Sequence, residues 1–166
     1  MSQSLSPGEK VERVTFAPWD TPVANDGLTL VTLRYGVTPS RIEYPTLGFA
    51  LAPIDEEPRR FELEAVFLSR EKRAAIIFGF SDVSAFRVLD EAGLVELWNA
   101  SAQTPRPSSA TFMVRGHTWQ KESELLWFHG ENQYSFMIAT DGECLEVVTS
   151  TPPIVEVSEA RVERLT

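Results

Sequence analysis

The sequence predicts a mainly β protein, an antiparallel sheet or sandwich-like domain with one or two short helices; α+β is the alternative class. Three observations favour β. Leu28 to Tyr35 alternates side chains with a period of two, as a half-buried strand does. Residues 61–68 and 73–80 are strand-like runs joined by a polar turn, which is typical of a β-hairpin. Residues 134–140 and 143–149 form a similar pair.

In the first half of the chain, Ser, Gly and Pro dominate residues 1–10 and predict a flexible tail. Residues 11–16 follow as a short strand, with Val14 and Phe16 on one face. The Pro-rich stretch from residue 36 to 58 reads as an extended excursion, with a candidate strand at residues 47–52.

In the second half, residues 83–89 predict another strand. Asp90 is a candidate N-cap for a short helix over residues 91–99, because a short acidic side chain can accept the unpaired amides of a first helical turn. Strands are also expected at residues 111–114 and, as an edge, at residues 154–157. Residues 119–128 fit either a helix or a buried strand, with helix slightly favoured.

The turn of the last hairpin carries the strongest local signal. Asp141-Gly142 separates residues 134–140 from residues 143–149, and Asp-Gly is a preferred pair for a two-residue hairpin turn. The inward faces of all these elements supply the predicted core: Leu30, Phe61, Leu63, Phe67, Ile76, Phe78, Phe86, Leu94, Trp98, Phe136, Ile138, Leu145 and Val147.

Size and charge limit the function. The 166 residues fit one globular domain, taken as residues 11–166 after the tail. A net charge of −9 opposes binding to nucleic acid and to anionic membranes, since such binding depends on Lys and Arg. One cysteine excludes an internal disulfide, and residues 1–10 have no apolar signal-peptide stretch. We therefore expect a cytoplasmic protein.

Residues that could do chemistry are few. Two histidines, His117 and His129, are too few and too uncertainly placed to predict a metal site, and no Gly-rich phosphate loop is present. Cys144 follows the hairpin turn between Glu143 and Glu146, where carboxylates would suppress a reactive thiolate. We therefore predict a strand residue there rather than a nucleophile. The sequence predicts no catalytic residue, no metal and no cofactor, and it leans against an enzyme.

Two features are candidates for an interaction surface. Trp19 lies in a Pro-rich loop, where an exposed aromatic ring would be an interface anchor and a buried one a core residue. Asp55, Glu56 and Glu57 form a solvated acidic turn. These four residues are the predicted contacts with a partner.

Two stretches are similar to segments of known bacterial proteins. Residues 80–91 (FSDVSAFRVLDE) and residues 134–153, with their ECLEV core and Pro-Pro ending, resemble small uncharacterised proteins, some grouped with the immunity proteins of polymorphic toxin systems. The resemblance covers about a third of the chain and contains no catalytic motif, so no site residue is transferred. Because proteins of that kind are mostly without an assigned activity, the resemblance implies a provenance rather than a mechanism.

These observations favour an acidic protein-interaction module, of the kind that could occlude a basic toxin domain through charge complementarity. An enzyme or a small-molecule-binding domain with a site assembled from scattered residues is the second reading. A structural homo-oligomer that pairs with itself is the third.

Overall fold

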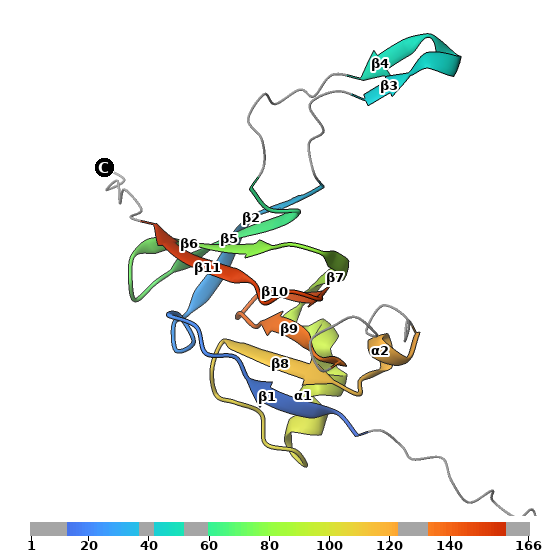
Figure 1. Cartoon of the computed structure of the whole chain (residues 1–166). Helices are drawn as coiled ribbons and strands as arrows, with labels where there is room; N and C mark the ends of the chain where they lie inside the picture. Colours follow the sequence, from blue (N-terminus) through green and yellow to red (C-terminus); the bar gives the residue numbers. More distant parts are fainter. Residues whose placement is uncertain (1–12, 37–41, 52–59, 123–132, 159–166) are drawn as a thin grey trace, which may run out of the picture.

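Two antiparallel sheets make up most of the protein, as the sequence predicts (Figure 1). The computed structural model describes residues 13–36, 42–51, 60–122 and 133–158. The five-stranded sheet has the order β1 (Thr15–Pro18), β8 (Thr111–Arg115), β9 (Ser135–Ile138), β10 (Glu143–Thr149) and β7 (Val83–Asp90). The four-stranded sheet has the order β11 (Ile154–Ser158), β6 (Ala74–Phe80), β5 (Leu63–Ser69) and β2 (Leu28–Tyr35).

Shorter elements complete the described chain. A two-stranded hairpin of β3 (Ile42–Tyr44) and β4 (Phe49–Leu51) surrounds the 3-10 turn η1 (Pro45–Leu47) and projects from the sandwich in Figure 1. The helical elements are η2 (Glu91–Leu94), α1 (Val95–Ser101) and α2 (Thr118–Glu122). None of the helices in the described ranges is long and apolar enough to cross a membrane.

The main core lies between the two sheets. Period-two alternation turns Leu63, Ala65 and Phe67 of β5 inward, and every one of them is fully buried. Phe67 and Phe78 meet edge to face with ring centroids 5.4 Å apart. Burial of this apolar surface is the main force that joins the sheets.

A second, smaller core lies on the other face of the five-stranded sheet. Leu94 and Leu97 of the helical segment pack there against Phe112, Met137 and Cys144. Asp90 caps this segment as predicted, because its Oδ1 accepts a hydrogen bond from the Ala92 amide at 2.9 Å. The five-stranded sheet is therefore covered on both faces.

Most predicted strands are confirmed. Strand β2 has the predicted bounds, and the strands expected at residues 61–68, 73–80, 83–89 and 154–157 differ by one to three positions. The first strand, expected at residues 11–16, begins instead at Thr15, and residues 11 and 12 lie outside the described chain. The core prediction holds except at Leu30, Phe86 and Trp98, which are only half-buried at the margins of the two cores.

The prediction of a two-residue turn at Asp141-Gly142 is wrong, although the hairpin that it was expected to join is confirmed. The ladder between β9 and β10 closes at Ile138 and Leu145, and neither Asp141 nor Gly142 has the positive φ of a two-residue type I′ turn. The loop between β9 and β10 is wider than a two-residue turn, and one of its backbone groups bonds to the helical segment instead of across the hairpin. The Gly142 carbonyl accepts the Glu91 amide at 2.9 Å.

Three predictions meet the limits of the described chain. The tail at residues 1–10 and the acidic turn Asp55, Glu56 and Glu57 lie outside it. The helix favoured at residues 119–128 is observed as α2 up to Glu122, and residues 123–132 lie outside the described ranges. The single domain at residues 11–166 stays a prediction.

Candidate functional site

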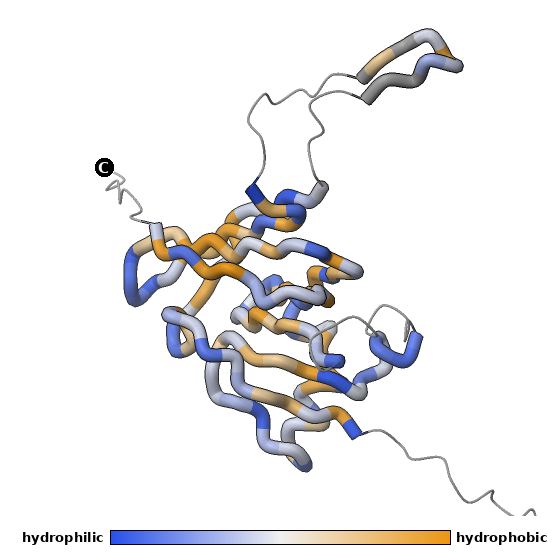
Figure 2. Tube along the Cα trace, viewed as in Figure 1, coloured by the Kyte–Doolittle hydropathy of each residue, from blue (hydrophilic) through white to orange (hydrophobic). Residues whose placement is uncertain are grey.

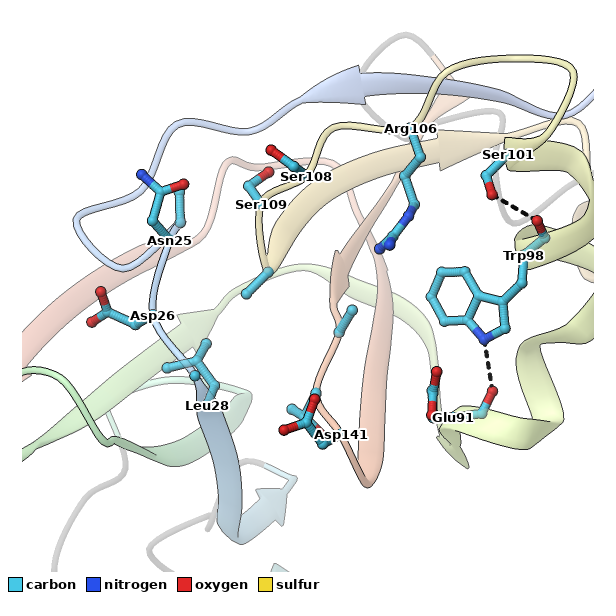
Figure 3. A pocket seen from close by; sticks show the side chains of 15 residues that line it. Asn25, Asp26, Leu28, Glu91, Trp98, Ser101, Arg106, Ser108, Ser109 and Asp141 are labelled. Atoms are coloured by element: carbon cyan, nitrogen blue, oxygen red, sulfur yellow. Dashed lines mark hydrogen bonds between the residues drawn. The ribbon is translucent and has the colours of Figure 1, made fainter.

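A pocket of about 460 Å³ opens at one end of the sandwich, where loops from four parts of the chain meet. Its wall combines the loop before β2, the helical segment η2–α1, the loop before β8 and the tip of the β9–β10 hairpin. Figure 3 shows Arg106 reaching into this space from the loop before β8, with Trp98 beside it and Glu91 and Asp141 across from it. Loops held by a rigid scaffold are where binding residues concentrate.

Backbone hydrogen bonds join these loops to one another. The Ala110 amide donates to the Ala24 carbonyl at 2.6 Å, and the Ala139 amide donates to the Ala110 carbonyl at 2.8 Å. With the bond from Glu91 to Gly142, these contacts connect all four segments. These tertiary contacts hold the loops in place, so the pocket is preformed and needs no ligand to assemble it.

Carboxylates gather at this end of the molecule, which we call the acidic rim: Asp90, Glu91, Asp141 and Glu143. Glu143 is opposite Asp90 in the β10–β7 ladder, a like-charge pair of the kind that destabilises a sheet. Asp141 lies 3.4 Å from Arg70 but is 84% exposed. Within the described residues, the other three rim carboxylates have no ion-pair partner.

Asp26 also lines the pocket, but its surroundings indicate a structural role. Its carboxylate accepts hydrogen bonds from the Ser69 hydroxyl at 2.7 Å and from Lys72 at 3.1 Å. Desolvation would raise the pKa of Asp26, but these two partners outweigh it and lower the pKa below its ordinary value. An ionised, fully bonded carboxylate of this kind fastens the β5–β6 turn to the loop before β2.

Arg106 is the cation inside the pocket. Its guanidinium lies over the ring of Trp98, 4.6 Å from the centroid, and 5.3 Å from the ring of Phe112. Trp98 is itself fixed, because its indole N–H donates to the Glu91 carbonyl at 2.8 Å. In the described part of the chain Arg106 has aromatic neighbours but no carboxylate partner.

Cys144 follows the hairpin tip, and its side chain is buried, whereas a half-buried strand residue was expected. Burial raises the pKa of its thiol, the nearby Glu91 and Asp90 raise it further, and bonds with Thr140 act in the opposite direction. The acidic neighbours differ from the predicted pair, Glu143 and Glu146. The environment suits a packed thiol and opposes a thiolate nucleophile.

A separate polar cluster lies on the helix-side face of the five-stranded sheet. Glu146 is 1% exposed, and Arg87 donates to it from two nitrogens, Nε at 2.7 Å and a terminal nitrogen at 2.6 Å. His117 Nε2 lies 2.8 Å from Glu146 Oε1, and the Ser135 hydroxyl donates to the same oxygen. Burial alone would raise the pKa of Glu146, but these contacts hold it below its ordinary value.

This cluster lacks the arrangement of a hydrolytic site. A serine nucleophile needs a base on its own hydroxyl, whereas Ser135 donates its proton to a carboxylate that Arg87 also holds. No group of three or more metal-ligating side chains occurs among the residues that the structure describes. His117 therefore has a structural place beside Glu146, and His129 lies outside the described chain.

The predicted interaction residues are not brought together in the described chain. Trp19 is half-buried and closes the end of the main core, with its ring edge to face against Phe136 at 5.0 Å and Phe78 at 5.8 Å. The other three predicted residues lie outside the described ranges. The pocket residues Arg106 and Glu91 were missed, because each occupies a polar segment whose role depends on tertiary contacts. The Asp90 cap was the one prediction made in this region, and it concerned the helix rather than a site.

Comparison with known proteins adds no relative. The chain matches no family model, no curated protein and no solved structure.

Proposed function

We propose that this protein is a binding module that receives a cationic group of a basic protein partner at the acidic rim. The observation that carries the proposal is the gathering of Asp90, Glu91, Asp141 and Glu143 beside a preformed pocket, where like charges face one another across two strands. Inhibition of a basic toxin domain, as an immunity-like protein would do in the cytoplasm, is the finer form of this proposal.

The physical argument rests on charge that the fold leaves uncompensated. Like charges opposite each other in a ladder cost stability, so a sequence that keeps them gains something else from them. A bound guanidinium or ammonium group would relieve the repulsion. The net charge of −9 would also speed the approach of a basic partner over a Debye length of roughly 8–10 Å. Neither nucleic acid nor an anionic membrane fits this surface.

A small-molecule ligand is the second candidate, and the volume of the pocket favours it. About 460 Å³ lies within the range of roughly 300–1,000 Å³ that ligand pockets occupy. Such a ligand would carry an anionic group for Arg106 and a cationic group for the rim. An enzyme is less favoured, because the described lining contains no histidine or cysteine and its carboxylate with a shifted pKa, Asp26, is fully bonded.

The test is binding of a short arginine-rich peptide, measured by calorimetry at low and high salt. We expect binding at low salt that weakens as salt rises, because counterions screen the rim. Glu91→Gln combined with Asp141→Asn should weaken binding without unfolding the protein, since both side chains are exposed.

Glu122→Gln on α2, compared with the single variant Glu91→Gln, is the matched control, since each removes one exposed carboxylate and Glu122 is not a rim residue. Equal weakening by the control would mean that only the overall charge matters. An unchanged affinity in the double variant would exclude the rim as the binding site, and binding of a zwitterionic small molecule that Arg106→Gln abolishes would favour the second candidate.

A further inference from the structure

The outer face of the four-stranded sheet has an unusual composition. Residues of β5 and β6 alternate between a fully buried inner row and an outer row, and the solvent side of an antiparallel sheet is normally polar. Here the outer row of the two central strands is apolar at four positions, Val66 and Leu68 on β5 and Ala75 and Ile77 on β6. Leu68 is 42% exposed. No helix of the described chain lies on this face, since α1 and α2 are on the side of the other sheet (Figure 1).

One end of this face is already covered by the chain itself. Gly79 has no side chain, and the ring of Phe61 occupies the space where one would be. A Cβ at Gly79 would lie within 2.5 Å of that ring. Arg60 lies over the ring of Phe61 and pairs with Glu156 on β11. The other end, with Leu68 and Ala75, has no such cover in the described residues. In Figure 2 the tubes of β5 and β6 are largely hydrophobic.

We propose that this outer face is a self-association surface whose occupant is the same face of a second copy of the chain. A two-fold axis along the strands would lay β5 of each copy over β6 of the other, the aligned packing that two sheets commonly adopt. The register then sets the pairs. Leu68 lies over the second copy's Ala75, and Val66 lies over the second copy's Ile77. Leu68 therefore meets a small side chain, Val66 meets the larger Ile77, and each pair occurs twice.

Charge supports the same arrangement. The face carries Arg34, Arg60, Glu64 and Glu156, two cations and two anions, on a chain whose net charge is −9. It is thus a neutral surface on a protein that repels copies of itself elsewhere. Glu64 is in register with Gly79, so in the two-fold arrangement it lies over Gly79 of the second copy. Phe61 and Arg60 of the second copy cover that glycine, which brings a cation near Glu64.

A further pairing occurs at the edges of the face. β2 of one copy lies over β11 of the other. Arg34 on β2 lies over the second copy's Ile154, and Glu156 of that copy is the next residue along the same face. A long arginine side chain can span this diagonal. A basic partner of the acidic rim would have no reason to select this face, whereas an identical neutral face matches it in size and in charge.

The experiment measures the oligomeric state of the full chain by light scattering across a dilution series. We expect a dimer that dissociates on dilution, and loss of the dimer in Leu68→Glu, which places a carboxylate over the second copy's Ala75 in the apolar part of the contact. Val95→Glu is the matched control, because Val95 is an exposed valine on α1 on the far side of the molecule. Circular dichroism verifies that both variants are folded.

A size exchange separates packing from a general effect of polarity. Ala75→Leu alone should weaken the dimer by placing leucine over leucine. The double change Leu68→Ala with Ala75→Leu should restore it, because large again lies over small. A wild-type monomer at every concentration would overturn the proposal and leave the face to another partner, and a dimer that Leu68→Glu does not affect would overturn it as well.

Discussion

Strand β10 carries two carboxylates, three residues apart, in opposite surroundings. Glu146, in the middle of the strand, is buried and bonded to Arg87, His117 and Ser135. Glu143, at the start of the strand, is exposed and lies opposite Asp90. The same residue type therefore stabilises the fold where its partners are complete, and where they are missing it belongs to the rim that we propose for binding. The two positions should respond to substitution in opposite ways.

The largest effect is expected at Glu146. Glu146→Ala removes the buried carboxylate and leaves the Arg87 guanidinium and the His117 ring without it. Breaking one side of a buried pair costs about 3–5 kcal/mol of unfolding free energy. Urea unfolding of the variant beside the wild type measures the loss. A loss below about 1 kcal/mol would mean that water reaches this cluster and screens it.

The free energy of unfolding should fall at acidic pH because of the same residue, Glu146. Because the folded-state pKa of Glu146 lies below its ordinary value of 4.5, the stability it contributes is fully present above about that pH. It is lost as pH falls through the lower folded-state pKa. Thermal unfolding between neutral and acidic pH should show this decline. Glu146→Gln should flatten it, apart from the share due to Asp26, whose pKa is also lowered. Parallel curves for the variant and the wild type would contradict the assignment.

An intermediate effect is expected at Asp90, which has a structural and an electrostatic role. Asp90→Ala removes the cap on the Ala92 amide, and such a loss costs about 1 kcal/mol. Asp90→Asn keeps an accepting oxygen and removes the charge, so it should cost less and also relieve repulsion with Glu143. Denaturant midpoints of the two variants test the cap, and equal losses would argue against it.

The smallest effect, and the only gain, is expected at Glu143. Glu143→Lys replaces a like-charge pair with an opposite-charge pair across β10 and β7, which favours folding by about 0.2–1 kcal/mol. The same change should weaken binding of the arginine-rich peptide, because it places a cation on the acidic rim. A variant that is both more stable and better at binding would refute the contrast between the two glutamates.

The sheets were predictable because their signal is local. β2 alternates inward Leu28 and Leu30 with threonine, whereas β5 and β6 are apolar runs of strand length on either side of a polar turn. The class, the hairpins and the Asp90 cap follow from such patterns. The tight turn at Asp141-Gly142 failed because a tertiary bond to Glu91 overrides the local preference.

The candidate site was not predictable, because no short stretch of chain contains it. Arg106 lies in a Pro-rich segment that reads as a plain surface loop, and only the packing of α1 places Trp98 beneath it. Glu146 has the pattern of a solvent-facing strand residue. It is buried because elements distant in the sequence cover that face. The register of β7 and β10 places Arg87 opposite it, and the segment after β8 brings His117 beside it.

The position of β9 has a consequence for hydrogen exchange. All four residues of Ser135–Ile138 are buried, and β9 pairs with β8 on one side and β10 on the other. Sheets or helical segments cover both of its faces, so local fraying cannot expose its amides to water. They should exchange with deuterium only when the whole domain opens, and their rates would then report the global free energy of unfolding. The amides of β2, which is the last strand of the four-stranded sheet in the described chain, should exchange earlier.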